Sequence, residues 1–206
     1  MTTFTIPASV TRIDNGVFID DDTFEQGSEL IDNYTFPNCQ NLTSRKIPES
    51  VIEIIFEQGS KIQLIDNSAF RYCRNLTSIT IPASVTIICD SAFSYCQNLK
   101  TVKFEQGSKL QLIANDAFNS TGITSITIPA SVKFIQDHAF HNCINLTSIT
   151  IPASVTSIGD SAFKNCKNLT DIIFEQGSEL PSIGRYAFSN TKIKLIIIPT
   201  YVDEKK

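Results

Sequence analysis

Two histidines and a cysteine, His138, His141 and Cys143, form the pattern HxxHxC, whose residue types are those that bind zinc. A closed zinc site needs four ligands, and no fourth is evident nearby. Cys143 recurs at one position of a repeat, which favours a packing role, whereas the histidines stand at variable positions. We interpret the histidines as exposed residues of a turn, and we expect no metal and no other cofactor.

Other reactive residues also follow a repeat. Ser84, Ser131 and Ser154 are copies of one position, and no base accompanies them as a nucleophile would require. A glycine-rich phosphate loop is absent from the sequence. Glutamates share one position of the FEQGS segments, where a solvated turn is favoured over a calcium site because the carboxylates would lie two rungs apart. These glutamates are Glu25, Glu57, Glu105 and Glu175. We expect the protein not to be an enzyme.

The elements that position these residues come from a repeat of about 23 residues, in the period range of solenoid proteins. IPASV begins at Ile6, Ile81, Ile128 and Ile151, with IPESV at Ile47, and an Ala-Phe pair follows at a fixed distance. We therefore predict one repeat array over 1–206, because such arrays grow by stacking units. Its units are 1–18, 19–41, a truncated 42–50, 51–75, 76–98, 99–122, 123–145, 146–168, 169–192 and a partial 193–206.

Each unit predicts a short strand followed by turns. In LTSITIP the isoleucines alternate with threonine, as in a strand with one buried face, and proline then ends the strand. Val85, Ile88, Ala92, Phe93 and Cys96 turn inward again, and DSAF suits a 3₁₀ or single helical turn. We expect an α/β-type repeat: a right-handed, horseshoe-like solenoid with one parallel sheet on its concave face and such turns on its convex face.

Composition excludes several classes. The net charge is −4 and the basic residues are scattered, which argues against nucleic acid as a partner. No apolar run reaches the roughly 18 residues of a membrane span. The first residues, MTTFTIPASV, lack the pattern of a signal peptide, so we expect either a protein that stays inside the cell or an excerpt of a longer chain, and we favour the excerpt.

The six cysteines predict thiols rather than disulfides. Five of them stand three residues after the repeat phenylalanine, which indicates an inward packing ladder. Asparagine follows at Asn41, Asn75, Asn145 and Asn168, each within an NxT sequon that we expect burial to shield. Asn33 and Asn119 are then the sequon asparagines that we expect to accept a glycan, if a eukaryote secretes the protein.

The motif LxxIxIPxSVxxIGxxAFxxCxxL, as in Leu146–Leu169, resembles the BspA-like class of leucine-rich repeats over essentially the whole chain. Ser154 and Val155 depart from the Asn and Leu of the general leucine-rich pattern. The resemblance implies a leucine-rich repeat solenoid of a surface or secreted protein that binds host-cell or extracellular-matrix proteins and associates with itself. The alternative is an intracellular scaffold or an architectural repeat, cytoplasmic and without a dedicated ligand.

Outward positions of the predicted sheet are the candidate partner-binding residues, because solenoids bind along extended faces. They are Ser78, Thr80, Thr101, Lys103, Ser125, Thr127, Ser148, Thr150, Asp171 and Ile173. Toward the C-terminal side the outward positions become apolar, and Leu195 and Ile197 are candidates for self-association. We expect this to occur by edge-to-edge pairing of the rung Ile193–Pro199.

Overall fold

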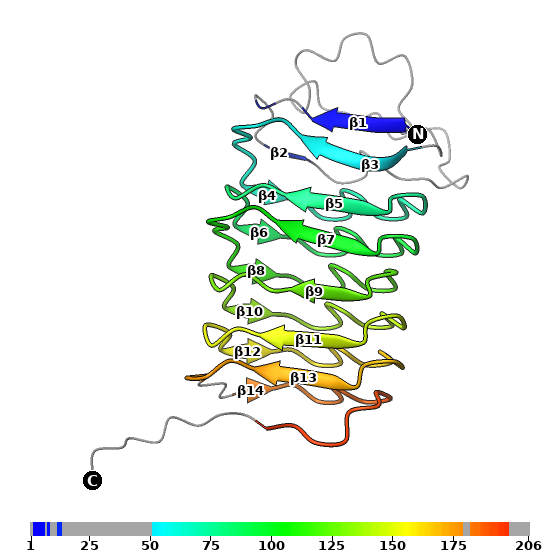
Figure 1. Cartoon of the computed structure of the whole chain (residues 1–206), viewed down its shortest axis with the longest axis vertical. Coiled ribbons are helices and arrows are strands. Elements are labelled where there is room, and N and C mark those ends of the chain that lie inside the picture. Colours follow the sequence, from blue (N-terminus) through cyan, green and yellow to red (C-terminus); the bar gives the residue numbers. More distant parts are fainter. Residues whose placement is uncertain (1, 7, 9–11, 14–50, 179–181, 198–206) are drawn as a thin grey trace.

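The computed structural model describes residues 2–6, 8, 12–13, 51–178 and 182–197. Within these ranges the chain winds into coils that stack on one another as a column (Figure 1). Each coil contributes one strand to each of two parallel sheets, and the strands of each sheet follow one another in the order of the chain. This is the parallel solenoid that the repeat predicts, with a second sheet that the sequence did not indicate.

The first sheet, which we call the wide sheet, holds the strands that the LTSITIP and FEQGS segments predict. Its strands are β1 (Thr2–Ile6), β3 (Val51–Phe56), β5 (Ser78–Ile81), β7 (Thr101–Phe104), β9 (Ser125–Thr127), β11 (Ser148–Ile151) and β13 (Asp171–Phe174). Alternation decides which side chains are buried: in β5, Ile79 and Ile81 are buried and Thr80 is exposed. β5 and β11 end immediately before Pro82 and Pro152, because proline has no N–H for the ladder.

The second sheet, which we call the narrow sheet, consists of two-residue strands on the other side of each coil. They are β2 (Arg12–Ile13), β4 (Leu64–Ile65), β6 (Ile87–Ile88), β8 (Leu112–Ile113), β10 (Phe134–Ile135), β12 (Ser157–Ile158) and β14 (Ser182–Ile183). The sequence predicted turns here because two residues are too short to show an alternation. Stacking supplies the pairing: Ile88 lies in register between Ile65 and Ile113.

The core between the two sheets is built from columns of equivalent apolar residues, of which the phenylalanine column is uniform. The phenylalanine column stacks ring on ring, with centroids 5.1 to 5.4 Å apart and planes within 13° of parallel. Its members are Phe70, Phe93, Phe118, Phe140, Phe163 and Phe188. Such a column buries little area within one coil, so its stabilisation arises only when coils stack.

The predicted helical or 3₁₀ turns are wrong for the residues that the structure describes, which contain no helix. In the coil of Phe93, every second N–H bonds within the turn, as Ser94 N does to Ser91 O. The intervening N–H groups donate to the next coil, as Phe93 N does to the carbonyl of Ala117. Ser91 and Tyr95 adopt φ of 57° and 63°, which interrupts any helix. The backbone thus exchanges helical hydrogen bonds for bonds between coils.

Glycine in the lengthened FEQGS turn takes the positive φ that the sequence predicts. Gly107 and Gly177 have φ of 77° and 83°. No atom lies within 4 Å of where a Cβ would stand, so backbone conformation alone selects glycine here.

Several sequence predictions fall on other parts of the chain. The units 19–41 and 42–50, with Cys39, Asn33 and Asn41, lie outside the described residues. In the wide sheet, β3 of the unit 51–75 pairs directly with β1 of the unit 1–18. At the other end, residues 193–197 form no strand, so the described part of the rung Ile193–Pro199 does not bear out the edge strand that the sequence predicted.

We predict that Phe140→Ala lowers the free energy of unfolding by about 3–5 kcal/mol, because the ring is fully buried between Phe118 and Phe163. Phe134, which is 46 % exposed, is the matched control, and its alanine variant should lose less than about 1 kcal/mol. Urea denaturation followed by circular dichroism measures both. Equal losses would contradict the role of the column.

Candidate interaction surface

The solvent-facing side of the wide sheet carries two rows of side chains, one from each outward position of the strands. In the first row, Ser78 pairs with Thr101, Thr101 with Ser125, Ser125 with Ser148, and Ser148 with Asp171. In the second row, Thr80 pairs with Lys103, Thr127 with Thr150, and Thr150 with Ile173. The structure therefore brings all ten sequence-predicted candidates onto one face.

These ten candidates differ in how far solvent reaches them. Ser78, Ser148 and Thr150 are half-buried by their neighbours, and the other seven are exposed. Seven of the ten are serine or threonine, and the others are Lys103, Asp171 and Ile173. The end of the face at β13 therefore combines a carboxylate with an apolar side chain that is 56 % exposed.

Sequence reasoning missed two residues of this face on β3, Glu53 and Ile55. Glu53 continues the first row through its pairing with Ser78, and Ile55 is 44 % exposed. VIEIIF gives little signal, because five of its six residues are apolar and only Glu53 marks the outward side.

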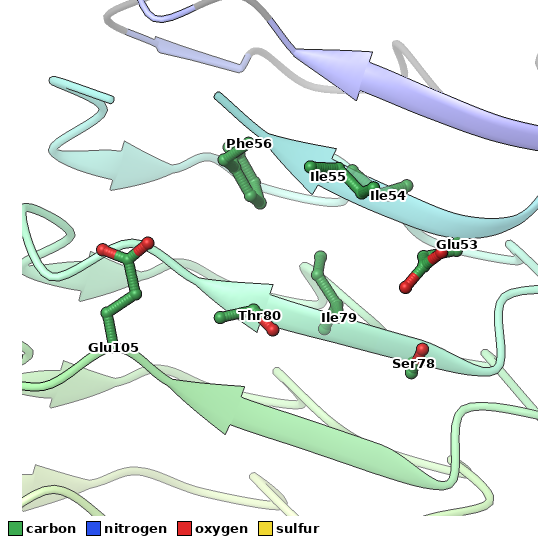
Figure 2. Close-up of a pocket in the computed structure, with 8 residues that line it drawn as sticks. All are labelled: Glu53, Ile54, Ile55, Phe56, Ser78, Ile79, Thr80 and Glu105. Carbon is green, nitrogen blue, oxygen red and sulfur yellow. The ribbon is translucent and has the colours of Figure 1, made fainter. Parts of the chain in front are cut away.

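A hollow of about 110 Å³ lies on this face between β3 and β5. Figure 2 shows Glu53 and Ser78 at one end, Glu105 at the other, and Ile55 and Thr80 between them. β3 and β5 pair at only two positions, whereas β5 and β7 pair at four. The strands separate where Pro82, which has no N–H, follows β5. The hollow is large enough for one side chain of a partner.

The FEQGS glutamates have a structural role that the sequence did not reveal. The backbone N–H of Glu105 donates to Ile81 O, and its Oε2 accepts from Ala83 N at 2.9 Å. Glu57 and Glu175 repeat both bonds toward the coils of Ile6 and Ile151. Each glutamate thus supplies a donor and an acceptor to the backbone around the proline of the preceding IPASV coil.

The two histidines pack together but are half-buried, so their predicted full exposure is wrong. Their rings meet edge to face with centroids 5.4 Å apart, and Nε2 of His141 lies 3.3 Å from Nδ2 of Asn165. Burial, together with the charges of His138 and Lys164, lowers the pKa of His141 below 6.5. In the described part of the chain, no three His, Cys, Asp or Glu residues are placed to hold a metal ion together.

Of the register cysteines that the structure describes, Cys96, Cys143 and Cys166 are buried free thiols as the sequence predicts, whereas the thiol of Cys73 is only half-buried. Each thiol donates to the carbonyl of the phenylalanine in the preceding coil, at 3.0 to 3.1 Å. Burial raises the pKa of the Cys96 thiol, which makes it a poor nucleophile. Ser84 and Ser154 are structural too, because their hydroxyls donate to Ile62 O and Val132 O.

The predicted shielding of the repeated asparagines is wrong. Asn75, Asn145 and Asn168 are exposed, because they lie in the turn that follows the buried cysteine. Asn119, expected as an acceptor, is half-buried, and its side chain bonds Asp116 and Ser120.

A second surface that the sequence did not single out lies on the narrow sheet. Its outward positions are apolar in four successive coils, occupied by Leu64, Ile87, Leu112 and Phe134. The first three are half-buried, so this stripe is less exposed to solvent than the face of the wide sheet.

No helix among the described residues could cross a membrane.

A comparison with known protein families identifies the family of this chain. The family described as "BspA type Leucine rich repeat region" matches in six copies, over residues 1–63, 19–147 and 63–194. The chain belongs to the BspA-type leucine-rich repeat family. This confirms the resemblance that the motif predicted. A comparison with curated protein sequences found no significant match.

Solved structures show the same repeat architecture. A leucine-rich repeat protein from Bacteroides ovatus is 30 % identical, with a TM-score of 0.60 over 73 % of this chain and 44 % of its own. The pneumococcal vaccine antigen PcpA is 24 % identical, with a TM-score of 0.56 over 96 % of this chain and 50 % of its own. This BspA-type chain therefore spans about half the length of these structures.

We predict that His141 makes this BspA-type repeat less stable in acid. Its pKa is lowered on folding, so the unfolded chain binds the proton more readily, and the free energy of unfolding falls as the pH drops below about 6.5. His141→Gln keeps an acceptor for Asn165 and should lose less stability between pH 7.5 and pH 5. Urea denaturation at both pH values measures the difference, and equal losses would exclude His141 as the cause.

Proposed function

We propose that this chain is a non-enzymatic protein-binding module of a surface-associated protein, which uses the wide sheet to bind a host-cell or extracellular-matrix protein. The observation that carries the proposal is the face itself: five strands, β5 to β13, turn ten side chains outward in two rows. Family membership and the likeness to a vaccine antigen support a surface location.

The chemistry of this face fits a protein partner. Small hydroxyls allow close approach of a backbone and offer hydrogen bonds, while Ile55 and Ile173 supply apolar contact at its two ends. The hollow beside Ile55 accepts one side chain, and the carboxylates of Glu53 and Glu105 at its ends favour a cationic one. Repeated inward residues hold the fold, so specificity rests on these outward ones.

We predict that Thr127→Arg and Lys103→Glu each weaken binding to a panel of purified extracellular-matrix proteins by at least tenfold, because both place a large or reversed charge in the centre of the face. Asn145→Arg and Lys167→Glu make matched changes at exposed positions of the turns and should leave binding unchanged. Surface plasmon resonance measures the affinities.

The outcome separates the two functional classes. The adhesin-type module is supported if Thr127→Arg and Lys103→Glu lose affinity while the two control variants keep it. If the wild type binds no member of the panel, or if both pairs of variants lose affinity equally, the proposal fails and the intracellular scaffold or architectural repeat becomes the better explanation.

We also propose that the chain associates with itself through its C-terminal apolar residues. Leu195 and Ile197 are 71 % and 67 % exposed, and Ile173 and Tyr186 are exposed on the nearest coil. Exposed apolar side chains of this size are favourably buried against a second copy.

We predict that Leu195→Asp combined with Ile197→Asp shifts the protein toward monomer in size-exclusion chromatography with light scattering. Ile144→Asp, at an isolated position that is 45 % exposed, is the control and should not change the molar mass. A wild-type protein that stays monomeric at high concentration would contradict the proposal.

A further inference from the structure

The turns of the two coils from 51 to 98 carry a cluster of two tyrosines and two arginines, which we call the Arg–Tyr cluster. The rings of Tyr72 and Tyr95 stack with centroids 5.0 Å apart and planes 16° from parallel. The guanidinium of Arg71 lies 4.8 Å from the ring centre of Tyr72 and 5.8 Å from that of Tyr95. The guanidinium of Arg74 lies 5.8 Å from the Tyr72 ring. Rings and cations are therefore held together on one ridge.

The backbone at the two tyrosines does not favour tyrosine. Tyr72 and Tyr95 have φ of 62° and 63°, a left-handed conformation that is rare for a bulky side chain and tolerated by asparagine. The same position carries Asn142, Asn165 and Asn190 in later coils. Those asparagines bond along the column, as Asn190 does to Asn165 at 2.8 Å. Ser120 holds this position in the next coil, so the backbone itself does not require tyrosine here.

The cations of the cluster have no acidic partner among the described residues. No carboxylate in the described ranges forms an ion pair with Arg71 or Arg74. Arg71 Nη2 donates to the hydroxyl of Tyr72 at 3.3 Å, while its Nε is buried and has no hydrogen-bond partner there. Two arginines with no carboxylate partner in the described ranges attract an anion locally, although the whole chain has a net charge of −4.

The backbone of these turns is already used, which limits what the ligand can be. Tyr72 N donates to Ser94 O, Cys73 N to Phe70 O, and Arg74 N to Tyr72 O. A peptide that needs main-chain hydrogen bonds has no donor to pair with here. Recognition must come from guanidinium groups, phenol hydroxyls and the positive edges of stacked rings.

We propose that the Arg–Tyr cluster is a second binding site, which takes the sulfate groups of a sulfated polysaccharide. A sulfate offers three oxygens to the planar forks of Arg71 and Arg74, and the hydroxyls of Tyr72 and Tyr95 reach its neighbouring oxygens. A polysaccharide has no backbone hydrogen bonds to satisfy, and it can approach the cluster from the side of Arg74, which is exposed, while Arg71, Tyr72 and Tyr95 are half-buried. This site is separate from the face of the wide sheet.

The chain offers matched variants for the test. Arg71→Ser with Arg74→Gln gives this coil the residues that the next coil carries, Ser94 and Gln97. Tyr72→Asn with Tyr95→Asn introduces the residue found at this φ in later coils, so the variant should fold at least as stably as the wild type. Lys164→Ser with Lys167→Gln removes an equally spaced pair of cations beside Asn165 and is the control.

Isothermal titration calorimetry of the whole chain with dextran sulfate, uncharged dextran and polyglutamate tests the proposal. We expect binding to dextran sulfate alone, weakened at least tenfold in the arginine and tyrosine variants and less than twofold in the lysine control. Higher salt should weaken the wild-type interaction, because salt screens the attraction between the arginines and the sulfate groups.

Four results would overturn the proposal: no wild-type binding to dextran sulfate, equal binding to polyglutamate, unchanged affinity in a well-folded tyrosine variant, or an equal loss in the lysine control. Polyglutamate binding would indicate an acidic polypeptide as the partner. Variants of the wide sheet, such as Thr127→Arg, should retain dextran sulfate binding, so this test fails or succeeds independently of the protein-binding function.

Discussion

The whole structure depends on one constraint: no coil can satisfy its own backbone or bury its own apolar side chains. In the turns, alternate N–H groups donate to the next coil, as Phe93 does to Ala117, and each buried ring lies on the ring of the neighbouring coil. Both requirements are met when neighbouring coils have the same backbone path and present apolar residues at the same inward positions. Repetition in the sequence is therefore the direct consequence of parallel stacking, and it removes the repeated residues from consideration as a binding site.

Because the two unit types alternate, neighbouring strands of the wide sheet pair over different lengths. We call a step between coils tight where many positions pair and loose where few do. Where an FEQGS coil follows an IPASV coil, its glutamate supplies the N–H and the carboxylate that bond the backbone around the proline, and β5 pairs with β7 at four positions. Where IPASV follows FEQGS, proline removes the donor, and β3 pairs with β5 at two positions and β7 with β9 at one. The hollow of the wide sheet lies at such a loose step.

Function is left to residues that the stacking does not constrain, and these lie on different sides of the coil. On the wide sheet they are the outward hydroxyls with Glu53, Ile55 and Lys103. On the turns they are residues that differ from those at the same position of other coils, above all Tyr72 and Tyr95, where later coils have asparagine. The two proposed sites share no side chain, so the residues of each site are independent of those of the other.

The sequence by itself determined the period, the inward residues of each coil, the strands of the wide sheet and the ten outward candidates, because a two-residue alternation and a 23-residue repeat are local patterns. Only the tertiary structure decided the rest. Helical turns gave way to left-handed turns, since bonds between coils compete with bonds within them. The narrow sheet, the glutamate bonds and the contact of Tyr72 with Tyr95 join residues that are at least 22 positions apart, and their geometry exists only after the coils have stacked.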